Sequence, residues 1–151
     1  MIKNFEEAYA QEQDMIRRYR EADSRGDQEA TTAIRAERKA WGAEIDAMGD
    51  AFVRMYCSYS ESRERRNKYL DFHEVIWDKD VKKIVDTMRQ HGIEKFTFSS
   101  GWSSAVETAW LFQMNGCRLE GLVEVNGSRN FNDKGEDDGF EKRHGYLFSV
   151  N

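Results

Sequence analysis

Apolar residues recur every three or four positions through roughly the first sixty residues, a spacing typical of helices that bury one face. The pattern breaks at the polar segment 23–27, where Gly26 suits the end of one helix and Asp27 the start of the next. Because the break is short, we expect an antiparallel helical hairpin. The apolar positions of its first helix are Phe5, Ala8, Tyr9, Met15, Ile16 and Tyr19.

The second helix carries a longer apolar seam, whose intervals after the first step alternate between four and three residues, as in coiled coils. Two interpretations stay open: the seam is a core, or it packs against another subunit. Gly42 and Gly49 weaken this helix, and we expect a kink at Gly49–Asp50. The seam consists of Ile34, Trp41, Ile45, Met48, Phe52, Met55 and Tyr59.

The second half mixes helical and alternating patterns. A helix is expected from Asp78 or Asp80 to Gly92, with Val81, Ile84, Val85 and Met88 on its buried face. Alternation predicts strands at 96–98, 119–125 and 146–150. The segment 104–115 is apolar around much of its circumference and therefore predicts a buried helix. Residues 128–143 are expected to form a polar loop.

These elements predict an α+β fold. An N-terminal antiparallel helical hairpin, 1–60, is expected to pack with a small three-stranded α/β unit, 78–151, in the order helix–strand–helix–strand–strand. The segment 61–77 would connect them within one compact domain. A strand–helix–strand order predicts a parallel pair with a right-handed crossover, and the last strand would pair antiparallel at either edge.

Composition narrows the function classes. A net charge of −5 argues against the whole chain as a nucleic-acid-binding protein. No apolar run approaches the ~18 residues of a membrane span, and the N-terminus lacks the apolar segment of a signal peptide. Cys57 and Cys117 are expected to be buried thiols in a bacterial cytoplasm. The His and Cys residues have no metal-ligand spacing, and we expect neither a metal nor a cofactor.

The turn 99–104 is the strongest candidate for a ligand site. It follows a predicted strand and precedes a helix, so an anion or nucleotide phosphate could bind there, through Ser99, Ser100, Gly101, Ser103 and Ser104. The alternative is structural: Ser104 and Glu107 have the spacing of a capping box. A serine nucleophile is less favoured, because Gly-Trp-Ser-Ser is not Gly-x-Ser-x-Gly, although His73, His91 or His144 could approach the turn.

A basic cluster offers a second surface. Arg63, Arg65, Arg66 and Lys68 could contact phosphates or a protein partner. Glu61 and Glu64 interrupt the cluster, which favours a solvated helix face with local ion pairs. Nucleic acid is therefore a possible but not a favoured partner.

Several strings resemble an uncharacterised domain family of Gram-positive gut bacteria, often carried by conjugative or other mobile elements. They are Ser62-Arg-Glu-Arg-Arg-Asn67, Ile76-Trp-Asp-Lys-Asp80, the segment from Phe96 to Phe112, Asn115 to Gly127, and the ending His144 to Asn151. The resemblance implies a setting, namely accessory proteins of mobile DNA, some of which act on host defence or transfer machinery. It implies no activity and no catalytic residues.

One favoured function and two alternatives remain from the sequence. The favoured one is a non-catalytic protein-interaction or accessory module with an unidentified protein partner, and a homo-oligomer through the long helix is possible. Such a module needs no convergent set of nucleophile, base and oxyanion donors, and the sequence shows none. The alternatives are an anion- or nucleotide-phosphate-binding protein or enzyme using the 99–104 turn, and a nucleic-acid-associated inhibitor using the basic cluster.

Overall fold

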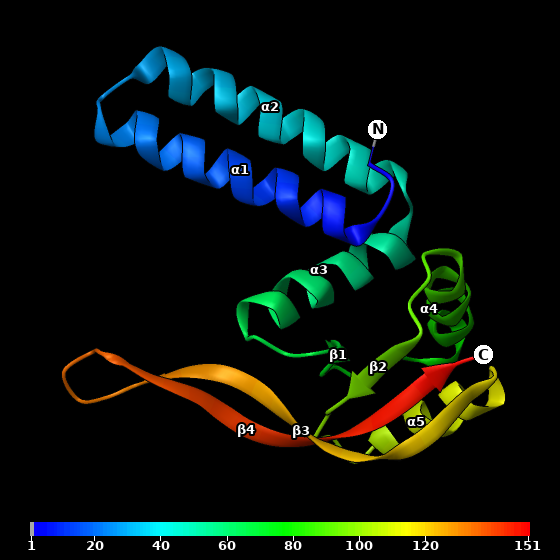
Figure 1. The fold of residues 1–151 in the computed structure, drawn as a ribbon. Coiled ribbons are helices and arrows are strands. Elements are labelled where there is room, and N and C mark those ends of the chain that lie inside the picture. Colours follow the sequence, from blue (N-terminus) through cyan, green and yellow to red (C-terminus); the bar gives the residue numbers. More distant parts are fainter. Residues whose placement is uncertain (1) are drawn as a thin grey trace. The chain divides into compact units, whose positions relative to one another are not determined.

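A computed structural model describes residues 2–151, which form an α+β fold (Figure 1). The chain divides into two compact units, and the boundary between them falls between Val53 and Arg54 in the sequence. This boundary lies within the third helix, and the segment 61–77 holds the end of that helix and the first strand. In chain order the elements are α1 (Phe5–Ser24), α2 (Gln28–Ala47), α3 (Asp50–Glu64), β1 (Leu70–Phe72), α4 (Asp78–Gln90), β2 (Lys95–Phe98), α5 (Ala105–Met114), β3 (Cys117–Phe131) and β4 (Asp137–Val150).

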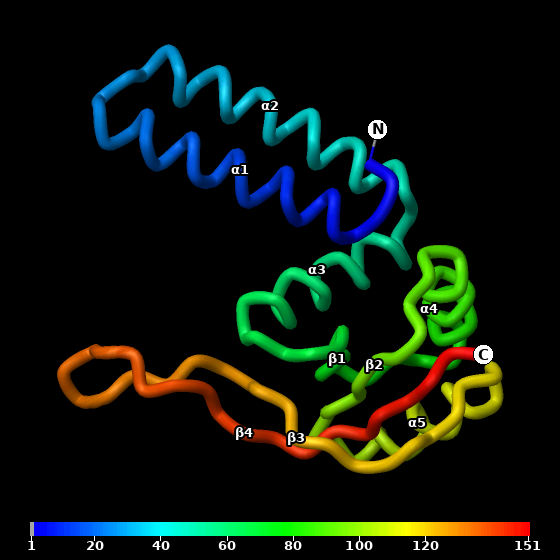
Figure 2. Tube along the Cα trace, in the orientation of Figure 1, coloured from blue at the N-terminus to red at the C-terminus, as the bar shows by residue number. Residues whose placement is uncertain are grey.

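The predicted helical hairpin is confirmed in the first unit, where α1 and α2 lie side by side (Figure 2). Gly26 adopts a φ of +67°, a left-handed conformation that glycine tolerates, so the chain can turn sharply after α1. The Asp27 side chain then accepts a hydrogen bond from the Ala30 N–H at 3.1 Å and caps α2. The buried residues Met15, Ala22 and Ile34 pack between the helices, with Tyr19, Ala30 and Trp41 beside them.

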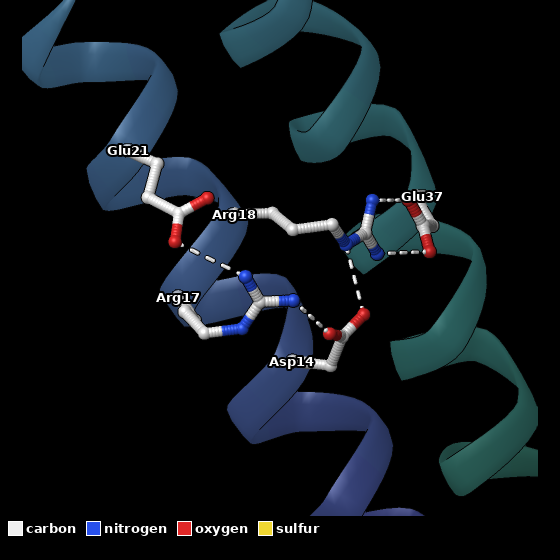
Figure 3. A network of polar contacts seen from close by, with 5 residues as sticks. All are labelled: Asp14, Arg17, Arg18, Glu21 and Glu37. Atoms are coloured by element: carbon white, nitrogen blue, oxygen red, sulfur yellow. Dashed lines mark hydrogen bonds and ion pairs between the residues drawn. The ribbon is translucent and has the colours of Figure 1, made fainter.

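A network of ion pairs joins the two helices of the hairpin (Figure 3). Arg18 donates two hydrogen bonds to Glu37, at 2.6 and 2.9 Å, and a third to Asp14 at 2.8 Å. Arg17 bridges Asp14 and Glu21 on the same helix. Because these side chains are exposed, they add little to stability. The forked Arg18–Glu37 pair instead favours one register of α1 against α2.

The expected kink in the second helix is a complete break. Gly49 has a φ of +99°, which no helical residue adopts, so α2 ends at Ala47 and α3 begins at Asp50. Much of the seam is buried: Ile34, Ile45, Phe52 and Met55 are buried, whereas Met48 is exposed. The Phe52 ring stacks on Phe5 with centroids 4.5 Å apart.

The sheet of the second unit has four strands, not the three expected. The additional strand is β1, which pairs parallel with β2. The predicted parallel pairing of β2 with β3 is wrong, because β4 lies between them and pairs antiparallel with both. The order is β1-β2-β4-β3. A tight turn after β3 lets β4 pair directly with β3. Closing such a short loop costs little conformational entropy.

The expected polar loop 128–143 is instead the distal part of the β3–β4 hairpin, which extends past the ends of β1 and β2 (Figure 1). The Asn132 side chain organises its tip by accepting hydrogen bonds from the N–H groups of Lys134 and Glu136. Both faces of this part of the hairpin carry mostly polar residues, so the sequence shows no alternation of apolar and polar positions that would predict a strand.

Aromatic rings form the core of the second unit. The Phe112 ring of α5 lies within 4.7 to 6.3 Å of the ring centroids of Phe72, Phe96, Phe98 and Phe148, one or more from each of three strands. The predicted helix 78–91 is confirmed as α4, with its four expected apolar residues fully buried.

Two predictions of burial are wrong. Helix α5 buries only one side, through Ala105, Thr108 and Phe112. On its other side Val106, Trp110 and Met114 are 69, 58 and 64% exposed. Cys57 is also exposed, whereas Cys117 is buried, and the two are not joined in a disulfide. Among the described helices, no segment combines the length and apolar character needed to cross a membrane.

Candidate functional site

The turn after β2 lies where two parallel strands end. Because β1 and β2 run in the same direction, their carboxyl ends meet at one edge of the sheet. The Ser99 N–H donates to the Phe72 carbonyl at 2.9 Å, so the chain still follows β1 for one residue beyond β2. An open pocket of about 810 Å³ lies at this edge, lined by Ser99–Ser103, His73 and three residues of β4, namely Glu141, Arg143 and His144.

The expected capping box at the start of α5 does not form. Ser104 has φ −75° and ψ 2°, and its side chain makes no capping hydrogen bond. A capping residue normally has an extended backbone, which brings its oxygen over the first turn. Ser100 instead accepts a hydrogen bond from the Trp102 N–H at 3.3 Å. Of the five predicted ligand residues, four line the pocket and Ser104 does not.

Asp71 forms a buried polar centre behind the pocket. It is 4% exposed and accepts hydrogen bonds from the Thr97 and Ser99 hydroxyls, both at 2.7 Å. Burial raises the pKa of the Asp71 carboxyl above its ordinary value, and the two hydroxyl donors and the nearby His73 and Arg143 oppose that shift. The Ser99 hydroxyl therefore donates its hydrogen to Asp71, and Ser100 and Ser103 are the serines whose hydroxyls can donate to a ligand in the pocket.

Arg143 is the cationic group of the pocket, and two neighbours position it. Its Nη2 lies 3.2 Å from Glu141 Oε2. Its Nε lies where a side chain on Gly127 would begin, 2.7 Å from the position a Cβ would take. A glycine on the neighbouring strand β3 thus leaves room for the guanidinium.

Two of the three histidines considered from the sequence reach the pocket. His73, which directly follows β1, and His144 of β4 line it, whereas His91 lies at the C-terminus of α4. His73 Nδ1 is 3.5 Å from Glu61 Oε2 of α3. Among residues 2–151, no three His, Cys, Asp or Glu side chains gather as metal ligands would.

The four residues of the predicted basic cluster lie away from the pocket and differ in exposure. Arg65 is half-buried and pairs with Glu61, while Arg63, Arg66 and Lys68 are exposed. The Lys68 ammonium lies over the Tyr69 ring, 5.2 Å from its centroid. None of the four lines the pocket.

The connection 65–68 is fixed to the sheet rather than free to adapt to a partner. Arg66 has a φ of +58°, and Asn67 exchanges two hydrogen bonds with the Asn126 backbone, at 2.8 and 3.0 Å. The Asn126 side chain in turn donates to the Arg65 carbonyl.

Sequence patterns indicated the turn but missed Asp71, Glu141 and Arg143. The short strand Leu70-Asp71-Phe72 places one acidic residue between two apolar ones, and this alternation is the signal that could have found Asp71. Arg143 was not recognised as a site residue, because residues 128–143 were expected to form a loop and not a strand of the sheet.

A family model described as a domain of unknown function, DUF7698, matches residues 54–150. Its limits coincide closely with those of the second unit, which contains the pocket, and the α1–α2 hairpin lies outside it. No curated protein and no solved structure matches the chain.

Proposed function

We propose, for a chain that belongs to the DUF7698 family of domains of unknown function, that the pocket at the carboxyl ends of β1 and β2 binds a small anion of the phosphate type. The observation that carries this proposal is the convergence of Arg143, His73 and His144 with the Ser99–Ser103 turn around one open pocket. Guanidinium, imidazole and hydroxyl groups are the donors that phosphate groups bind.

The charge of Arg143 supports the proposal even though Glu141 is close. A guanidinium has five N–H donors, and Arg143 contacts Glu141 through Nη2. The remaining donors can form the forked contact that arginine makes with phosphate oxygens.

Titration of inorganic phosphate into the labelled full chain tests the proposal. We expect amide shifts at Ser99–Ser103 and a tenfold or greater loss of affinity in Arg143→Met, because a hydrogen bond to a charged group is worth about 1.5–3 kcal/mol. Gly127→Ala should also weaken binding with little loss of stability, since its Cβ displaces the Arg143 side chain. Arg118→Met, an exposed arginine outside the pocket, should change nothing. Unmoved amides at Ser99–Ser103 would reject the proposal.

A second candidate is the protein-interaction module expected from the sequence, and one observation favours it. Val106, Trp110 and Met114 follow one another at intervals of four residues and expose an apolar face along α5. The matching partner is a protein that covers this face with apolar side chains of its own, since exposed apolar patches of this kind often mark interaction sites.

Site-specific photo-cross-linking in the native host tests this second function. A photoreactive residue at position 110 should yield an adduct of one defined mass, and one at the exposed position 113 on the same helix should not. The purified partner should then bind the Trp110→Ala variant at least tenfold more weakly, because buried tryptophans dominate such interfaces. Equal adducts from both positions would contradict it.

We further propose that the protein is a cytoplasmic accessory of a mobile element in Gram-positive gut bacteria. The sequence strings that resemble such proteins support the setting, and two cysteines that remain thiols fit a reducing compartment. Genes for conjugation or integration should lie beside its own gene, and a neighbourhood of housekeeping genes in every host would argue against this.

A further inference from the structure

The pocket is larger than a phosphate needs and contains an aromatic surface. Its volume of about 810 Å³ falls within the range of small-molecule and cofactor sites. Trp102 lines the pocket and is 73% exposed, although it lies on the same turn as the phosphate-binding serines. A large indole left open beside an anion site can stack on a planar ring.

The pocket also presents both signs of charge. Glu141 lines it together with Arg143, and Glu141 contacts Arg143 through its Oε2 atom. This carboxylate weakens the binding of an anion that brings no hydrogen-bond donor, although Arg143 still attracts it. A ligand that carries hydroxyl or amino donors as well as an anionic group would be accepted, because those donors can bind the free carboxylate oxygen.

From these features we infer that the ligand is a nucleotide, with its phosphate at Arg143, its base stacked on Trp102 and its sugar or base donors near Glu141. This inference rests on the proposed phosphate site and names the ligand class. Aromatic stacking contributes about 5- to 150-fold in affinity for each base and tolerates any base, because every base has a π face.

The test compares ligands that differ by one part. The four ribonucleoside monophosphates, ribose 5-phosphate and adenosine are titrated into the full chain, and the Trp102 indole N–H is followed by NMR. At least one monophosphate should bind tenfold or more tightly than ribose 5-phosphate and shift that signal. Trp102→Ala should remove this preference and keep the affinity for ribose 5-phosphate, while Trp102→Phe should retain part of it. Trp77→Ala, which alters an exposed tryptophan outside the pocket, is the matched control and should behave as the wild type.

The outcomes separate this inference from the proposed function. If ribose 5-phosphate binds as tightly as every nucleotide, the nucleotide inference is overturned while the phosphate site stands. If adenosine binds and neither phosphate nor ribose 5-phosphate does, the phosphate site fails and the inference falls with it. The same holds if no ligand shifts any pocket amide.

Discussion

Replacing Phe112 by alanine will lower the free energy of unfolding of the second unit by about 3–5 kcal/mol. Phe112 is fully buried, and its ring contacts rings from β1, β2 and β4. Its removal leaves a cavity where three strands meet, and rigid strands cannot collapse to fill it. Denaturant unfolding, followed through hydrogen exchange of the Phe96 and Phe148 amides, measures the loss.

Val106→Ala is the matched control for this prediction. Val106 lies on the exposed side of the same helix, so its truncation should change the free energy of unfolding by no more than about 0.5 kcal/mol. A loss below about 1 kcal/mol in Phe112→Ala would mean that α5 does not seal the aromatic core.

The second large effect is expected at Asp71. Asp71→Ala should cost about 2–4 kcal/mol, because it leaves the buried Thr97 and Ser99 hydroxyls without their acceptor. The triple variant with Thr97→Val and Ser99→Ala should recover part of the loss, since it removes the stranded donors. No recovery would show that the lost volume, and not the hydrogen bonds, sets the cost.

The same carboxyl predicts a pH dependence of definite sign. Burial holds the pKa of folded Asp71 above its ordinary value of 3.8, so as pH rises from 3.8 the unfolded chain loses this proton before the folded chain does. The unfolded state then binds fewer protons, and stability falls until the pH passes the pKa of the folded state. Asp71→Asn cannot ionise and should lack this decline.

Unfolding curves of the wild type and Asp71→Asn at a series of pH values above 3.8 give the measurement. As pH rises, the free energy of unfolding of the wild type should fall relative to that of Asp71→Asn, and the difference should then become constant. Parallel curves would show that the pKa of Asp71 is not shifted, and a shift toward the wild type would show that it is lowered.

The candidate site was only partly visible in the sequence. The turn itself was predictable, because Ser99–Ser103 follows an alternating strand and is built from small residues. The roles of the individual serines were not predictable. Ser99 donates its hydroxyl hydrogen bond to Asp71, and the Ser104 side chain does not cap α5. Gly127 on β3 leaves room for the Arg143 side chain on the neighbouring strand β4. No pattern in the sequence near either residue indicates this contact.

The sequence by itself determined the elements whose signals are local. The α1–α2 hairpin, α4 and the short strand β2 follow from helical or alternating periods and from glycines at helix ends, which depend only on nearby residues. Tertiary structure alone decided that β1 joins the sheet, that β4 lies between β2 and β3, and that one side of α5 stays exposed. Strand order and register depend on pairing between distant segments. The pocket exists only because β1 and β2 end beside the middle of β4, which brings His73, Ser99 and Arg143 together.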